Sequence, residues 1–389
     1  MNYGNFEQIK KIRQQLAMSG HPEQQFQTIH VAGTNGKGST SAMVAAILQA
    51  LGYRVGVFTS PYLHSPYEQI QVNGLSIKEE DFLRWQKKLA QSTFSEFEQW
   101  VLVAIHYFAE QKCDYVVLEC GLGGEYDATN IVMQTEYVLF TKISLDHTEW
   151  LGDTIKKIAT TKAKIIRSNS QVIVAPNQHD EVKAVIHAEC AQQQATCHLA
   201  PLVSSPNWNG VPFAFNLKGH HQLENLSTVL QWYALFCQKE KLLPNADVLS
   251  RALGKLKVLG RMEQLSGQLW VDVAHNEDSV AAFVDYVREQ FAGQSCAIVV
   301  GFLKDKDVGA CLAHLQEIAS HFVVTEPDFD ARKMDAEQLV EVLHQLEVSA
   351  DKMTCIKAPQ EAIQWALHQF ERVFVVGSFY LVKEAYSCI

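Results

Sequence analysis

Short runs of apolar residues alternate with helical patterns along the first half of the chain. The runs cover residues 28–32, 54–59, 115–119 and 137–141, and helices are predicted after Gly38 and from residue 79 to about 112. Strands that are apolar on both faces and separated by helices are typical of a parallel sheet with helices on both sides. The pattern therefore predicts an α/β fold, because a sheet with one face in water would alternate apolar and polar residues.

The same alternation starts again after Gly260 and continues for about 130 residues, a usual domain size. It predicts, in order, strand 269–273, helix 279–291, strand 297–300, helix 308–319, strand 322–325, helix 335–346 and strand 373–376. Between the two series lie a turn-rich stretch, 204–210, and a long helical pattern, 220–240. We expect two α/β domains, 1–259 and 260–389, with a cleft between them, the second being smaller and Rossmann-like.

The composition restricts the partners and the compartment. The chain has 33 Lys and Arg against 43 Asp and Glu, a net charge of −10 at pH 7, so we expect no nucleic-acid partner. No apolar stretch reaches the ~18–20 residues of a membrane span, and the first residues do not resemble a signal peptide. We expect a cytoplasmic protein without membrane contact. Nine cysteines, an odd number without a C-x-x-C pair, predict free thiols.

A glycine-rich loop follows the strand that ends at residue 32, and a helix is predicted directly after the loop. Glycines let backbone N–H groups turn inward, and a helix N-terminus adds partial positive charge, so this order of elements favours phosphate binding. A lysine in such a loop reaches the β- and γ-phosphates, and a hydroxyl contacts Mg²⁺. The first domain is therefore predicted to be P-loop ATPase-like, although Gly38 interrupts the usual G-K-[ST] spelling. The candidate ATP-binding residues are Gly33, Thr34, Asn35, Gly36, Lys37, Gly38, Ser39 and Thr40.

A second glycine-rich stretch, 121–124, follows the strand 115–119. A dinucleotide site with the pattern G-x-G-x-x-G would need a glycine where Tyr126 stands. A nicotinamide cofactor is therefore not expected.

Polar residues stand where two other strands end. Glu119 closes an apolar strand, and His147 follows the strand that ends near residue 141. A buried carboxylate is costly unless it is paired or bound to a cation. If both strands neighbour the loop strand, Glu119 and His147 converge near Ser39 and Ser60, where Mg²⁺ would offset phosphate charge.

Taken together, the motifs resemble the dihydrofolate synthase/folylpolyglutamate synthase family, a branch of the Mur ligase superfamily. The matching segments, in the family's order, are 28–39, 59–61, 121–124, 127–130, 145–152, 219–225, 260–263, 272–276, 304–307 and 376–380. The resemblance implies an ATP-dependent, ADP-forming ligase that joins the carboxylate of a pterin or folate to L-glutamate. ATP first phosphorylates the carboxylate to an acyl phosphate, which the glutamate amine then attacks. We also expect a monomer.

The resemblance implies roles for individual residues. Catalysis is assigned to Lys37, His147, Lys162 and His275. One Mg²⁺ is assigned to Ser39, and a second Mg²⁺ to Ser60, Glu119, His147 and a carbamylated Lys162. ATP is further contacted by Gln222 and Asn225 near the adenine, and by Arg261 and Asp272 from the second domain.

Several family signatures are altered in the loops associated with the acid substrate. Tyr62 stands for a histidine, and Gln69 and Glu125 stand for arginines. The loss of two guanidinium groups, one replaced by a carboxylate, puts the pterin substrate in doubt, and each change alone is also consistent with drift. The predicted substrate-contacting residues are Tyr62, Gln69, Glu125, Asp127 and Ser378. We also expect most of the N-terminal helix that precedes the loop in the family to be missing.

Three alternatives remain beside the folate ligase. A divergent Mur-type ligase would couple a different carboxylic acid to an amino acid in a specialised pathway. An inactive ATP-binding paralogue is disfavoured because Lys37, Glu119, His147 and Lys162 are all present. A P-loop kinase or motor ATPase is disfavoured because it has no need for a second domain that carries Arg261.

Overall fold

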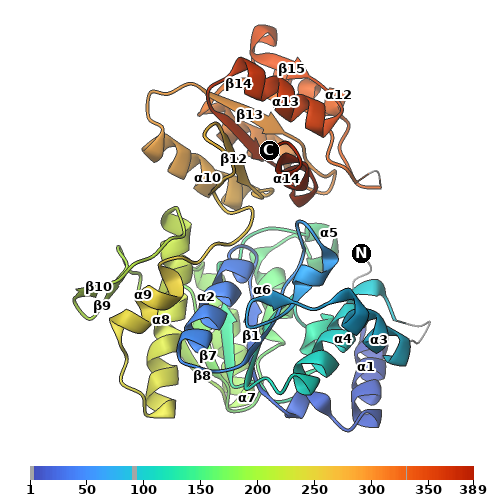
Figure 1. The fold of residues 1–389 in the computed structure, drawn as a ribbon, viewed down its shortest axis with the longest axis vertical. Helices are drawn as coiled ribbons and strands as arrows, with labels where there is room; N and C mark the ends of the chain where they lie inside the picture. The colour runs from blue at the N-terminus through green and yellow to red at the C-terminus, as the bar shows by residue number, and fades with distance from the viewer. Residues whose placement is uncertain (1–3, 90–93, 330) are drawn as a thin grey trace. The chain divides into compact units, whose positions relative to one another are not determined.

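The computed structural model describes residues 4–89, 94–329 and 331–389. They form two compact units (Figure 1). The first unit runs to Asn216 and resumes over His221–Lys257, and the second takes Leu217–His220 and Val258–Ile389. The division therefore falls two residues before the boundary suggested by the sequence, between 259 and 260. Residues 90–93, inside the predicted helical range 79–112, lie outside the described residues.

The first unit is built on an eight-stranded sheet with the order β4-β3-β2-β5-β1-β6-β7-β8. Its strands are β1 (Gln27–Ala32), β2 (Val55–Phe58), β3 (Ile70–Val72), β4 (Leu75–Ser76), β5 (Tyr115–Glu119), β6 (Tyr137–Phe140), β7 (Gln171–Val174) and β8 (Thr196–Leu199). The run from β2 to β8 is parallel, whereas β3 and β4 pair antiparallel at one edge. The predicted parallel α/β sheet is confirmed, and β3, β4, β7 and β8 add to it.

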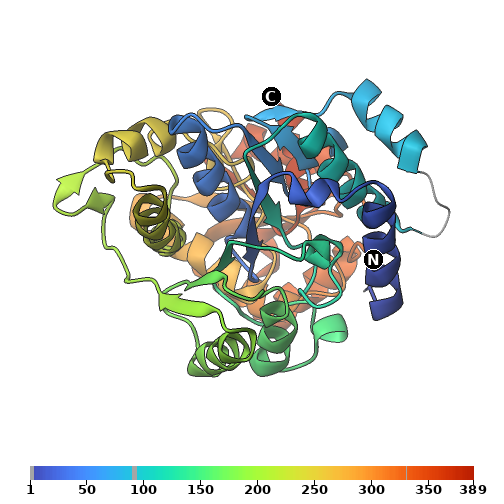
Figure 2. The same ribbon diagram turned by 90° about the horizontal axis from the view of Figure 1, so that it is seen from below.

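Helices cover both faces of this sheet (Figure 2). The helices are α1 (Phe6–Met18), α2 (Lys37–Ala50), α3 (Glu79–Leu89), α4 (Glu96–Glu110), α5 (Thr148–Leu151), α6 (Ile155–Ala163), α7 (Asp180–Gln193), α8 (His220–Glu240) and α9 (Ala246–Leu253). Alternate residues of β5 face opposite ways: Val116 and Leu118 join a core with α4, while Tyr115 meets Phe236 of α8 with ring centroids 5.6 Å apart. This two-sided burial explains why the strands are apolar throughout.

The expected loss of the N-terminal helix is wrong. Asn5 caps α1 by accepting a hydrogen bond from the Gln8 amide at 3.0 Å. Ile9, Ile12 and Leu16 recur with helical spacing and are buried against the first core. A cap followed by an apolar stripe is sufficient for a helix in this short segment.

The second unit is built on a six-stranded sheet with the order β11-β12-β16-β13-β14-β15, in which β11 alone is antiparallel among the described strands. Its elements are β11 (Glu263–Gln264), β12 (Leu269–Asp272), α10 (Glu277–Gln290), β13 (Cys296–Val300), α11 (Val308–Gln316), β14 (Ala319–Val324), α12 (Ala336–Gln345), β15 (Met353–Cys355), α13 (Pro359–Gln369), β16 (Val373–Val376) and α14 (Phe379–Tyr386). Helix α10 begins two residues earlier than predicted because Asn276 caps it, accepting from the Ser279 amide at 3.0 Å.

The structure also bears on the cysteines and on membrane-spanning helices within the described residues. All nine cysteines lie within the described ranges and are free thiols, as predicted. Within those same ranges, no helix has the length and apolar character needed to cross a membrane.

Candidate functional site

The glycine-rich loop 33–36, predicted to bind phosphate and called the phosphate loop below, joins β1 to α2 at the carboxyl edge of the first sheet. Gly36 adopts a left-handed conformation (φ 89°) at the N-cap of α2, and Lys37 is the first helical residue. A glycine N-cap has no side chain with which to occupy the first amides of the helix. The N-terminus of this 14-residue helix therefore offers N–H groups and partial positive charge to an anion.

The segment after β6 holds the loop in shape. The carbonyl of Lys142 accepts hydrogen bonds from the amides of Thr34 (2.8 Å) and Asn35 (3.3 Å). The Thr34 hydroxyl donates to Ser144 O and accepts from Ser144 N, both at 3.0 Å. Four hydrogen bonds thus tie the loop to the neighbouring strand's exit.

Two lysines donate to loop carbonyls. The Lys37 ammonium donates to Thr34 O at 3.0 Å, and Lys162 of α6 donates to Gly33 O at 2.7 Å. Lys162 is only 5% exposed. Burial, and then the charge of Lys37, lowers the pKa of Lys162 to about 7. The loop carbonyls are therefore bound by Lys37 and by a buried lysine of α6 whose pKa is lowered.

The predicted metal ligands come from adjacent strands at the same edge. Glu119 ends β5, is 4% exposed and pairs in register with Val31 of β1. A Cβ added at Gly38 would lie 3.6 Å from Glu119 Oε2, so this carboxylate faces the first turn of α2. Ser60 follows β2, the other neighbour of β5.

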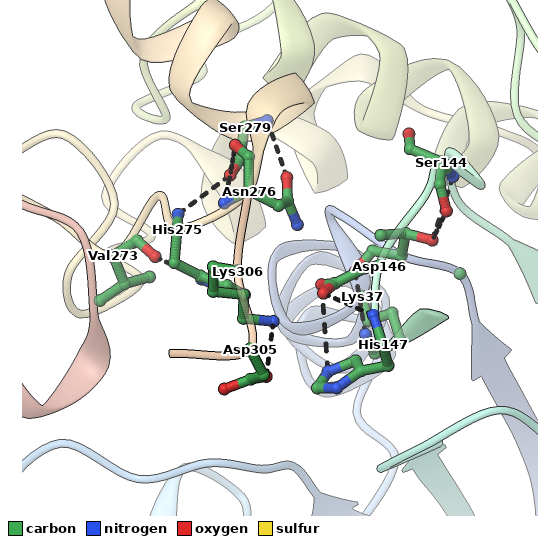
Figure 3. Close-up of polar contacts among 12 residues, drawn as sticks. Lys37, Ser144, Asp146, His147, Val273, His275, Asn276, Ser279, Asp305 and Lys306 are labelled. Carbon is green, nitrogen blue, oxygen red and sulfur yellow. Dashed lines mark hydrogen bonds and ion pairs between the residues drawn. The ribbon is translucent and has the colours of Figure 1, made fainter. Parts of the chain in front are cut away.

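His147 follows β6 and is the N-cap residue of α5, with a left-handed conformation (φ 50°). Its amide donates to Asp146 Oδ1 at 2.8 Å, and its Nε2 lies 3.9 Å from Asp146 Oδ2 (Figure 3). No three His, Cys, Asp or Glu side chains gather as a metal site in the described part of the chain. A site with Glu119 and His147 therefore needs the serine hydroxyls or a modified lysine as further ligands.

Gln222 and Asn225, both on α8, lie against the loop. Gln222 Nε2 donates to Ser39 Oγ at 3.2 Å, and Asn225 Nδ2 donates to Gln222 Oε1 at 3.1 Å. A Cβ at Gly36 would come within 2.1 Å of Asn225 Oδ1, so Gly36 is required for the approach of α8. The structure thus places this pair beside the phosphate loop; their expected proximity to adenine stays a prediction.

In the second unit, polar side chains organise the segments that carry the predicted residues. Asp272 is buried and accepts from the amides of Met262 and Ala274, each at 2.8 Å, and burial raises its pKa. The Arg261 guanidinium lies 5.3 Å from the ring centre of Phe379. Met262 follows Arg261 in the sequence, and Ala274 precedes His275. The Asp272 carboxylate therefore fixes the backbone beside both of these predicted site residues.

The other two predicted residues of the second unit also have local partners. His275 Nδ1 is 2.7 Å from Val273 O (Figure 3). The buried hydroxyl of Ser378 accepts from the Leu381 amide at 3.1 Å and so caps α14.

The loops predicted to contact the acid differ in character. Tyr62 is exposed, but Gln69 is buried and donates to Pro66 O at 3.1 Å, so its amide is turned into its own loop. The Asp127 carboxylate accepts from the amides of Leu122 (2.8 Å) and Thr129 (2.9 Å), and burial raises its pKa. Asp127 therefore organises the loop between β5 and β6.

Glu125 lies in that same loop and is half-buried. Its amide donates to Thr161 O at 2.8 Å, and a Cβ at Gly124 would lie 2.8 Å from the Cα of Lys162. Of the substituted residues, Glu125 is thus the one whose backbone is tied to the Lys162 segment.

The sequence did not single out Gln178, which follows β7. It is buried, and its amide bonds to the backbone of the segment after β6. No motif marks this residue, and only the pairing of β6 with β7 brings it to the site.

Comparisons with known proteins match both units. The Mur ligase middle domain matches residues 31–232, and the Mur ligase, glutamate ligase domain, matches residues 260–379. Dihydrofolate synthase/folylpolyglutamate synthase of Bacillus subtilis is 34% identical over 357 residues, covering 82% of this chain and 81% of the relative.

Solved structures agree with these matches. Folylpolyglutamate synthase of Mycobacterium tuberculosis, complexed with ADP and AMPPCP, has a TM-score of 0.89 at 26% identity, covering 97% of this chain and 94% of that one. A bifunctional folylpolyglutamate synthase/dihydrofolate synthase with Mn, AMPPNP and L-glutamate bound has a TM-score of 0.84 at 27% identity, covering 100% and 94%. The chain belongs to the dihydrofolate synthase/folylpolyglutamate synthase family of Mur ligases.

Proposed function

We propose that the protein is an ATP-dependent, ADP-forming ligase that joins the carboxylate of a pterin or folate to L-glutamate through an acyl phosphate. The observation that carries this proposal is the phosphate loop, with its glycine-capped helix and its two lysines, in a chain of this family. The relatives' complexes with ADP, AMPPCP, AMPPNP and L-glutamate support both co-substrates.

The chemistry explains why these groups are needed. A carboxylate is a poor electrophile, and phosphorylation by ATP converts one of its oxygens into a leaving group while ADP departs. The amine of glutamate then attacks the acyl carbon, a proton leaves the nitrogen, and phosphate is expelled. Negative charge develops on the transferred phosphoryl group, and Lys37 at the helix N-terminus stabilises it. We assign Arg261 and Asp272 to ATP, and His275 and Ser378 to the region where glutamate meets the activated acid.

The donors at the sheet edge fit Mg²⁺, which prefers hydroxyl and carboxylate oxygens. We assign one ion to Ser39 and a second to Ser60, Glu119, His147 and a carbamate on Lys162. When bound, Mg²⁺ neutralises phosphate charge. Carbamylation joins CO₂ to a neutral amine and releases a proton, and the burial of Lys162 favours the neutral amine.

The remaining assignments are also proposals. We keep the domain limits 1–259 and 260–389, a monomeric state, and the cytoplasm as the compartment. The alternative acid, outside the folates, is favoured by Glu125, whose carboxylate would repel a substrate with several negative charges. Gln69 contributes less to this argument because its amide is engaged with Pro66 O.

The test is release of ADP with acid and amine supplied separately and together. We expect continued turnover, beyond a single ADP per enzyme, only when both are present, with dihydropteroate as the acid and L-glutamate as the amine. We expect a lower kcat/KM for tetrahydrofolate diglutamate. Sustained ADP release with neither acid nor amine supplied would indicate an ATPase, which contradicts the proposal.

The variant Glu125→Arg tests whether the charge at this position determines the preference between dihydropteroate and tetrahydrofolate diglutamate. It should raise kcat/KM for the diglutamate more than for dihydropteroate, because it replaces a repelling charge by an attracting one. If no pterin supports ADP release but another carboxylic acid does, the divergent ligase is correct instead.

A further inference from the structure

Gln178 is a buried polar residue between two exposed ones. It is 4% exposed, whereas Asn177 and His179 on either side are exposed to solvent. Asn177 has a left-handed conformation (φ 56°), which turns the chain between the end of β7 and the start of α7. The Gln178 side chain therefore enters the protein at the carboxyl edge of the sheet, beside the exit of β6.

Both ends of the Gln178 amide are bonded to the backbone after β6. Its Nε2 donates to Thr141 O at 2.7 Å, and its Oε1 accepts from Ile143 N at 3.1 Å. An amide side chain supplies the donor and the acceptor, side by side, that these two backbone groups need. Loss of either would leave a backbone group of this segment without its Gln178 partner.

The Ile143 N–H belongs to the same peptide plane as the Lys142 carbonyl. In a trans peptide these two groups are fixed in one plane and point in opposite directions. The Lys142 carbonyl accepts from the amides of Thr34 and Asn35 in the phosphate loop. By holding the N–H end of this plane, Gln178 thus fixes the direction in which the carbonyl end faces the loop.

The loop is closely fitted to this segment at a second point. A Cβ at Gly33 would lie 1.9 Å from the Thr141 Oγ1, so the backbone of the loop lies directly against the Thr141 side chain. Thr141 also donates its amide to Ala32 O at 2.9 Å. A displacement of the 141–143 segment is therefore transmitted to residues 33–35.

We propose that Gln178 is a positioning residue for the nucleotide phosphates: it orients the Lys142–Ile143 peptide, which in turn sets the amides of Thr34 and Asn35. This proposal rests on the proposed function only in that the loop binds a nucleotide. It assigns Gln178 no contact with substrate. A residue that merely stabilised the fold would change the melting temperature and leave the loop and its affinity unchanged.

The variants are Gln178→Glu and Gln178→Met, with Gln99→Glu as the matched control. Glutamate retains the acceptor but turns an oxygen toward Thr141 O, and methionine removes both bonds at similar volume. Gln99 of α4 donates to Phe94 O at 3.0 Å, so its replacement removes the same kind of bond outside the loop. The measurements, on the full chain, are the Kd for ADP without metal, hydrogen exchange at the Thr34 and Asn35 amides, and the KM values for ATP and L-glutamate.

We expect both Gln178 variants to weaken ADP binding about tenfold, which corresponds to about 1.4 kcal/mol. The Thr34 and Asn35 amides should exchange faster, KM for ATP should rise, and KM for L-glutamate should stay unchanged. Gln99→Glu should alter only the melting temperature.

Unchanged exchange at Thr34 and Asn35 in both variants would overturn the proposal, as would ADP affinity equal to that of the wild type. The exchange measurement needs no ligand, and it therefore tests directly whether Gln178 orients the Lys142–Ile143 peptide toward the loop. A wild-type protein that does not bind ADP would instead contradict the proposed function.

Discussion

Burial of the Lys162 amine lowers the stability of the folded state when the amine is charged. Its pKa is lowered to about 7, mainly by burial, whereas an unfolded chain has a lysine pKa of about 10.4. Between these values the unfolded chain binds a proton that the folded chain lacks, so stability rises with pH through this window. The penalty is complete below pH 7, where the buried amine is charged, and disappears near pH 10.

We therefore expect Lys162→Met to raise the melting temperature most at or below pH 7, with a gain that shrinks toward pH 10. The measurement is thermal unfolding across this range in metal-free buffer without CO₂. Lys164→Met is the control, because Lys164 pairs with the buried Glu189 at 2.6 Å and its loss should lower stability. A gain for Lys162→Met that is constant with pH would contradict the burial argument.

At the level of elements, the contact between α2 and α8 makes the two loop glycines unequal. Gly36 has a positive φ, and its added Cβ would collide with Asn225 Oδ1 at 2.1 Å, whereas a Cβ at Gly38 would meet only Glu119 Oε2 at 3.6 Å. Gly36→Ala should lower the free energy of unfolding by at least ~1–2 kcal/mol, from backbone strain alone. Gly38→Ala should maintain or raise it, since alanine is favoured over glycine by up to ~1 kcal/mol within a helix.

Urea unfolding of both variants measures this difference. Equal losses would mean that neither the approach of α8 nor the left-handed backbone distinguishes the two positions.

Several elements are predicted because their own residues carry the pattern, although β7, a buried apolar run at residues 172–174, is not among them. The strands β5 and β16 and the helix α8 begin and end at the predicted residues, because each is a bounded run of one clear pattern. Strand β8 was missed, since it lies at the sheet edge and its residues are exposed or half-buried, which leaves no apolar run. The motifs of the sequence indicate most residues of the site but not Gln178, because its hydrogen bond to Thr141, 37 residues away along the chain, depends on the pairing of β6 with β7.

At the scale of the whole molecule, each unit has apolar cores of its own. The first contains two clusters, one that includes α4 and one that includes α6, and the second packs around Phe374. We expect calorimetry to show two unfolding transitions, of which ADP raises the one that belongs to the phosphate loop.

The variant Phe374→Ala shows which unfolding transition belongs to which unit. This fully buried ring lies in the second unit, and its removal should cost that unit about 3–5 kcal/mol while the ADP-sensitive transition stays in place. A single transition that both ADP and Phe374→Ala displace would show that the two units unfold as one.

The order of the strands along the chain has a consequence for synthesis on the ribosome. Every strand of the eight-stranded sheet is complete by Leu199, but α8, whose Trp232 and Phe236 pack against Tyr137, extends to Glu240. At about 5–20 residues per second, a nascent chain carries the sheet for seconds before this helix emerges. During that interval the aromatic side chain of Tyr137 lacks the cover that Trp232 and Phe236 later provide.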